Sequence, residues 1–243
     1  MLEKNRILLS FQLALFFIIL ILPIANSIQL LLLFLLWVVT FRKLGPGEWI
    51  LFILVNIIFT FNNIMAIRNG TFEFILPSSA SKNEIFVSNG SLYILGVPIF
   101  EVFLWGFYIL HTKRMLRLKL YSSSLLKPFL LSILFSLSFS LFPTQLGILL
   151  ATTASVLTLF MFFHEKQDIL CAGYMVFIGT ILEHIGVHFG IWKYPGNYLT
   201  GVAYWYVNLF AGTGVLLNRL ALPLTSKIIK MFTLKEQYLE SER

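Results

Sequence analysis

Long apolar runs broken by short polar segments make up most of this chain. The first run, Ile7 to Phe41, contains no charged residue, and Pro23, Asn26 and Ser27 interrupt it. A spanning helix needs about 20 mostly apolar residues, so we interpret this run as a hairpin of two helices. Later runs predict helices at Glu48 to Ile67, Leu95 to His111, from Pro128 onward, Leu146 to Phe163, Asp168 to Phe189 and Gly201 to Leu222. The pattern predicts an all-α polytopic membrane helical bundle of about eight transmembrane helices.

The composition agrees with a membrane protein. Hydrophobic residues make up 58% of the chain and charged residues 12%, with a mean hydropathy of +0.86, whereas a soluble domain carries about 25% charged residues. The single cysteine, Cys171, excludes an intrachain disulfide framework. The net charge of +7 could suggest a nucleic acid partner. In so apolar a chain the basic residues more plausibly set membrane orientation, and we expect no nucleic acid partner.

Basic residues gather on one side of the predicted bundle. With the N-terminus inside, only Arg68, Lys82 and Lys193 fall on the outer side. This asymmetry follows the positive-inside rule and predicts cytoplasmic N- and C-termini, in a bacterial inner membrane. A cleaved signal peptide ending near Ala25 is the competing interpretation, but the apolar run resumes directly afterwards.

The two halves of the chain resemble each other. The segment Asn62–Phe74 aligns with Leu182–Tyr194, and both end in Gly-x-aromatic-x-aromatic. After loops of unequal length, Gly96 aligns with Gly201 and Arg114 with Arg219. We therefore predict an internal duplication. Its parts are a first half at residues 1–115, a second half at 116–224, each with four helices, and a polar cytoplasmic tail at 225–243.

Two acidic residues stand inside apolar runs. Burying an ionisable group in hydrocarbon is costly, so Glu101 and Glu183 each need a partner, water or a function. Counting 1.5 Å per residue from the outer helix ends places them at similar depth, where they could share one cavity. The repeat places Asn63 opposite Glu183 and Tyr206 opposite Glu101. A structural hydrogen bond to a neighbouring helix is the equally weighted alternative for either acid.

His184 and His188 are spaced i,i+4 beside Glu183. Two histidines are too few ligands for a typical metal site, and we expect neither a metal nor a cofactor. The alternative is that His184 orients Glu183 while His188 lies at the membrane interface. Aromatic residues also crowd the outer end of the last predicted helix, among them Trp192, Tyr194 and Tyr206. They fit an interfacial belt, or the walls of a cavity that stabilises a cation.

The segments Asn62–Phe74 and Gly96–Trp105 resemble the repeated unit of the small integral-membrane lycopene cyclases. In that family each unit runs from an acidic helix end through Gly-x-Trp-x-Phe/Tyr to Pro-x-Glu-Glu. Glu183–Tyr194 resembles the second unit and is also similar to the carotenoid 1,2-hydratases. Only Glu101 remains of the first Pro-x-Glu-Glu, and Ala203–Tyr206 replaces the second.

The resemblance implies a non-redox enzyme that protonates a double bond of a carotenoid-type or isoprenoid lipid, giving cyclisation or hydration. In this hypothesis Glu101 is the acid, and Glu183, held by His184, steadies the cation or accepts the departing proton. The substrate-binding candidates are Asn63, Trp105, His188, Trp192, Tyr194 and Tyr206.

Three alternatives stay open. One is a proton-coupled transporter with Glu183, His184 and His188 as its relay. The others are a non-catalytic lipid-binding membrane protein and a structural subunit. The expected partners are the bilayer and a lipid, and the sequence predicts no oligomeric state.

Overall fold

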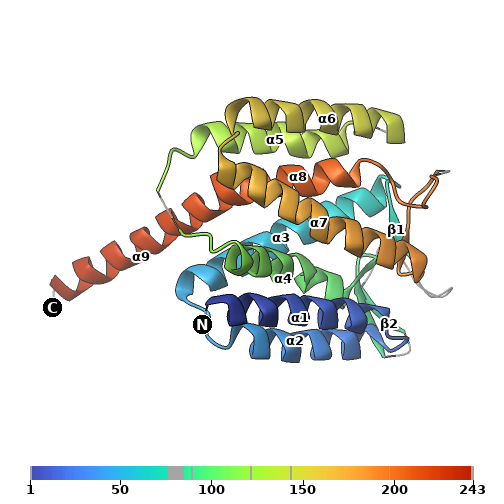
Figure 1. Ribbon diagram of the computed structural model, residues 1–243, viewed down its shortest axis with the longest axis horizontal. Helices are drawn as coiled ribbons and strands as arrows, with labels where there is room; N and C mark the ends of the chain where they lie inside the picture. The colour runs from blue at the N-terminus through green and yellow to red at the C-terminus, as the bar shows by residue number, and fades with distance from the viewer. Residues whose placement is uncertain are drawn as a thin grey trace.

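Helices account for most of the chain, as the apolar pattern predicts. The computed structural model describes residues 2–75, 85–88, 90–120, 122–142, 144–196 and 198–241, so Lys82 of the orientation argument lies outside the described residues. The helices are α1 (Leu2–Ile21), α2 (Asn26–Phe41), α3 (Pro46–Arg68), α4 (Ile99–Met115), α5 (Leu126–Ser140), α6 (Gln145–Phe162), α7 (Lys166–His188), α8 (Tyr206–Leu216) and α9 (Leu222–Ser241). They form a bundle of roughly aligned helices, from which α9 projects at one end (Figure 1).

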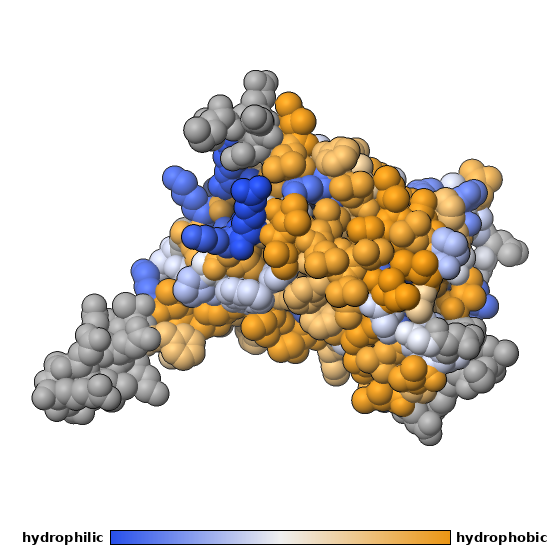
Figure 2. All heavy atoms as spheres, turned by 90° about the horizontal axis from the view of Figure 1, so that it is seen from below, coloured by the Kyte–Doolittle hydropathy of each residue, from blue (hydrophilic) through white to orange (hydrophobic). Residues whose placement is uncertain are grey.

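The structure is that of an integral membrane helical bundle. Among the described residues, four helical stretches are long and apolar enough to span a membrane: Pro46–Arg68, Gln145–Phe162, Lys166–His188 and Tyr206–Phe232. Shorter apolar helices are Arg6–Ile21, Asn26–Phe41 and Leu126–Ser140. Figure 2 shows apolar surface over the middle of one face, with hydrophilic residues toward both ends and the most strongly hydrophilic toward the end where α1 begins. The number of complete spans and the sidedness of the termini stay predictions.

Helix α4 begins later than predicted. We expected it to start at Leu95, but β3 (Ser91–Ile94) and β4 (Val97–Pro98) pair across a two-residue turn there. Leu95 and Gly96 both have positive φ, at 51° and 85°, as tight hairpin turns require. β2 (Ile85–Ser88) pairs with β3 on its other edge. A small antiparallel sheet therefore precedes α4.

The last predicted helix is also corrected. Residues 201–205 are not helical, α8 begins at Tyr206, and the helix continues through the π-helical turn Leu217–Ala221 into α9. Pro223 lacks the N–H that an α-helix would offer to the carbonyl four residues earlier, which explains a local change of helical geometry. The segment predicted as a polar tail, 225–243, continues helix α9 as far as Ser241.

Two helix hairpins, α3 with α4 and α7 with α8, have similar ends. Gly70 and Gly190 follow α3 and α7, and both have a φ of +67°, which favours glycine. The short strands β1 (Glu73–Phe74) and β5 (Trp192–Lys193) come directly afterwards and pair antiparallel. The repeated Gly-x-aromatic-x-aromatic pattern thus ends a helix and starts a strand in both hairpins.

Candidate functional site

A cavity of about 440 Å³ lies between α3, α5 and the α8–α9 stretch. One wall runs along α3 from Leu54 to the C-cap residue Asn69, and at 1.5 Å per residue this wall is about 22 Å long. Serines line the α5 wall at intervals of one helical turn: Ser132, Ser136 and Ser140. Because these side chains are small, α5 leaves room opposite the larger residues of α3.

The mouth of the cavity lies on the apolar outer surface. Ile58 and Phe61 of α3 line the cavity and are 46% and 62% exposed, and Ile133 and Leu137 of α5 are each 42% exposed. In a bilayer these side chains face hydrocarbon, since they belong to apolar helices. The cavity is thus reached laterally, between α3 and α5.

Glu101, from the first turn of α4, lines this cavity and is buried. Its Oε1 accepts a hydrogen bond of 3.0 Å from the side-chain amide of Asn63 on α3. Its Oε2 is buried and has no hydrogen-bond partner. Glu101 is therefore only half satisfied by the protein.

Glu183 reaches the same cavity from α7 and is also buried. Its Oε2 accepts two hydrogen bonds, one of 3.0 Å from the Trp192 indole and one of 2.6 Å from the Tyr194 hydroxyl. Burial raises the pKa of the Tyr194 phenol above its ordinary value, so this group stays a donor. Glu183 and Glu101 are close enough to act on each other's charge.

The local fold explains how Trp192 and Tyr194 reach Glu183. Side chains alternate along β5, so Trp192 and Tyr194 are buried while Lys193 points outward to Glu73. Gly186, one turn after Glu183, lets the Trp192 ring lie against α7, because a Cβ at this position would overlap the indole. Sequence spacing alone gave no hint of this contact.

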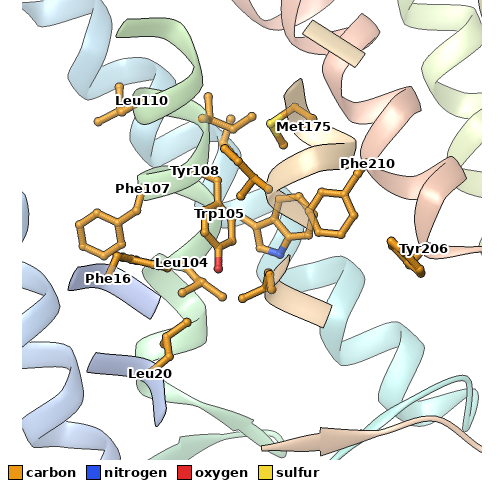
Figure 3. Close-up of a cluster of buried hydrophobic side chains, with 14 of the residues drawn as sticks. Phe16, Leu20, Leu104, Trp105, Phe107, Tyr108, Leu110, Met175, Tyr206 and Phe210 are labelled. Carbon is orange, nitrogen blue, oxygen red and sulfur yellow. The ribbon is translucent and has the colours of Figure 1, made fainter. Parts of the chain in front are cut away.

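Trp105 lies one turn after Glu101 and also lines the cavity. Its indole stacks on Phe59 of α3 at 3.7 Å between ring centroids and on Phe210 of α8 at 5.2 Å. Figure 3 shows Trp105 beside Phe210 in the buried cluster, with Tyr206 set apart from them. Trp105 therefore forms a rigid wall between the two hairpins.

The structure brings six of the candidate residues to one cavity: Asn63, Glu101, Trp105, Glu183, Trp192 and Tyr194. His184, His188 and Tyr206 do not line it. We expected His184 to hold Glu183, but its Nδ1 lies 2.7 Å from the Thr180 carbonyl instead. Neighbouring helical residues point about 100° apart, which directs His184 away from Glu183. Tyr206 contacts the Thr180 hydroxyl instead, and His188 is exposed.

Residues that the sequence analysis missed complete the cavity. They include Phe72, Phe74, Trp205, Thr213 and the serines of α5. The Ser-x-x-x-Ser-x-x-x-Ser spacing inside an apolar helix was a readable signal, because small polar residues repeated on one helix face leave space there. Trp205 carried no such signal; its indole donates to Gln145 of α6 at 2.6 Å only because the chain folds back.

No protein-family model and no curated protein matches this sequence. The structure, however, is similar to solved structures. A crystal structure of MvINS, a mycobacterial Insig homologue from Mycobacterium vanbaalenii, aligns with a TM-score of 0.58 at 14% identity and covers 75% of this chain and 97% of that chain. A cross-linked trimer of MvINS aligns with a TM-score of 0.59 at 13% identity and covers 76% of this chain and 96% of that one. At such low identity the likeness shows the fold alone.

The resemblance to lycopene cyclases and carotenoid hydratases is wrong. The similar structures are those of an Insig homologue, and no family model supports a carotenoid enzyme. The segments that suggested the resemblance have a structural explanation, since Gly70 and Gly190 end helices and the aromatic residues after them pack inward at β1 and β5. The Gly-x-aromatic-x-aromatic pattern is therefore typical of a helix that ends and is followed by a strand, and unrelated folds can contain it.

Proposed function

We propose that this protein binds a membrane lipid in the cavity between α3, α5 and α8. The supporting observation is the cavity itself: about 440 Å³, apolar along most of its walls, with two carboxyl groups in its lining. Its volume is within the range of about 300–1,000 Å³ that is usual for small-molecule sites. A chain-like apolar ligand fits a cavity that follows α3 for about 22 Å.

The surroundings of the cavity favour a ligand that arrives from the bilayer. The mouth lies among Ile58, Phe61, Ile133 and Leu137, which are exposed on apolar helices. A lipid can enter there without crossing water, and its apolar tail then exchanges one hydrocarbon environment for another. The polar part of the ligand would meet Asn63, Glu101 and Glu183 deeper in the cavity.

A photoreactive long-chain lipid in nanodiscs tests this function. Ser136→Trp places a large ring in the cavity wall and is expected to reduce labelling of α5 about tenfold. Leu134→Trp is the matched control, because Leu134 is an exposed residue of the same helix that does not line the cavity. Equal labelling of both variants and of the parent protein would refute the proposal.

A further inference from the structure

Glu101 and Glu183 differ from the other acidic residues whose ion pairs the structure describes. Glu48, Glu73, Glu165 and Asp168 each pair with a lysine or arginine. Among the described residues, no salt bridge reaches Glu101 or Glu183. A buried carboxyl group without a cationic partner takes up a proton, unless a ligand supplies the positive charge that holds it ionised. The protein therefore leaves the cationic role open at the cavity.

The groups that do contact these two acids are all hydrogen-bond donors. They are the Asn63 amide, the Trp192 indole and the Tyr194 hydroxyl, and the Trp105 indole also lies near Glu101. The carboxyl groups are thus arranged as acceptors, and one acceptor, Oε2 of Glu101, is buried in the cavity wall without a donor. The missing group is another donor, and the ligand is its natural source.

The charge of the site selects among polar head groups. A phosphate or carboxylate head would bring a further negative charge and no positive charge to compensate either acid. A hydroxyl supplies one donor and also brings lone pairs. A protonated amine supplies three donors, no acceptor and a positive charge, and so satisfies both the empty oxygen and the uncompensated acids.

We propose that the ligand is a long-chain amine, an amphiphile whose ammonium group lies between Glu101 and Glu183. Its chain follows the apolar cavity toward α8 and α9. This inference rests on the proposed lipid-binding function and specifies the class of lipid.

Chain-matched ligands test it. Hexadecylamine, hexadecanol and palmitate compete with the photoreactive lipid in nanodiscs containing the full chain. The amine is expected to compete at least about tenfold better than the alcohol, since a desolvated charged hydrogen bond exceeds a neutral one by about that factor. Palmitate is expected to be the weakest competitor.

Two isosteric variants locate the effect. Glu101→Gln and Glu183→Gln are each expected to weaken competition by the amine about tenfold while leaving the alcohol nearly unchanged. Glu165→Gln is the control, because the Glu165 side chain is 73% exposed and does not line the cavity. Unchanged gel-filtration profiles of the variants establish that they fold.

The outcomes are distinguishable. If hexadecanol competes as well as the amine, or if Glu101→Gln and Glu183→Gln both leave the amine unaffected, the amine inference is overturned while lipid binding stands. If no ligand competes and Ser136→Trp does not alter labelling, the proposed function itself fails.

Discussion

Two helix hairpins, α3–α4 and α7–α8, carry an acid in the first turn of one helix and a base near the end of the next. Glu48 of α3 accepts hydrogen bonds from Lys113 and Arg114 of α4. Asp168 of α7 accepts two from Arg219 and one from Asn218. Both acids also accept a backbone N–H three residues earlier, from Gly45 and Glu165. The hairpins are therefore closed at the same end by the same kind of contact.

The hairpins differ in how completely they satisfy their acids. Asp168 and Glu48 are both held on both oxygens, but Asp168 is fully buried, whereas Glu48 keeps some exposure. In the cavity, Glu183 of the second hairpin has two donors, and Glu101 of the first has one donor and an empty oxygen. The acids of the second hairpin are thus held by the protein itself, whereas Glu101 of the first hairpin has an oxygen that can accept a hydrogen bond from a ligand.

The largest effect is expected from Asp168→Asn. Removing this charge leaves Arg219 with only the exposed carboxylate of Glu165, and breaking a buried pair of this kind costs about 3 kcal/mol of the free energy of unfolding. Glu48→Gln is expected to cost less, about 2 kcal/mol, because the Glu48 side chain keeps 14% exposure and Gln can still accept hydrogen bonds from Lys113 and Arg114. Unfolding in mixed micelles measures the free energy of unfolding of both variants. Equal losses would contradict the idea that the more deeply buried acid contributes more to stability.

A somewhat smaller effect is expected from Gly186→Ala. The added methyl group overlaps the Trp192 ring, and overpacking of this kind costs about 1–3 kcal/mol. Displacing Trp192 also removes a donor from Glu183, so binding of the photoreactive lipid is expected to fall together with stability. Gly173→Ala is the control, since nothing lies within 4 Å of its Cβ position. A stable Gly186→Ala protein with unchanged labelling would show that Trp192 does not position the site.

The two buried glutamates can be compared directly by removing their donors. Asn63→Leu takes the donor seen on Glu101 and is expected to cost about 2 kcal/mol. Tyr194→Phe leaves Glu183 with Trp192 and is expected to cost about 1 kcal/mol. Unfolding in mixed micelles measures the free energy of unfolding of both variants. A larger loss for Tyr194→Phe would mean that Glu183, rather than Glu101, depends more on a single donor.

The smallest effect is expected where the hairpins meet at the surface. Lys193 pairs with Glu73 across β1 and β5 at 3.1 Å, and the lysine side chain is 61% exposed. Lys193→Gln is therefore expected to change the free energy of unfolding by no more than about 0.5 kcal/mol. A loss of several kcal/mol would mean that this exposed pair contributes substantially to holding the hairpins together.

The internal duplication stays a prediction, and the comparison of the hairpins favours it. Arg114 and Arg219, aligned by sequence, each bind the acid at the start of the preceding hairpin helix. Gly70 and Gly190 share one backbone conformation. The proposed boundaries at residues 115 and 224 follow from this alignment, although α9 continues the last helix through the second boundary.

The sequence by itself determined the membrane class, most helix positions and the two acids worth attention. Apolar runs and charges are local properties, and hydrocarbon penalises every unpaired polar group in the same way. The start of α4 was misplaced because a two-residue turn at Leu95 and Gly96 overrides an apolar run. The family resemblance failed because short aromatic and glycine patterns report helix ends, which many folds share.

Only the tertiary structure decided which side chains meet. Trp192 and Tyr194 turn toward Glu183 because β5 pairs with β1, and His184 turns away because α7 sets its direction. The cavity exists because α5, distant in sequence, places three serines opposite α3. Contacts between distant segments depend on how helices pack, and helix packing is a property of the whole bundle rather than of any one apolar run.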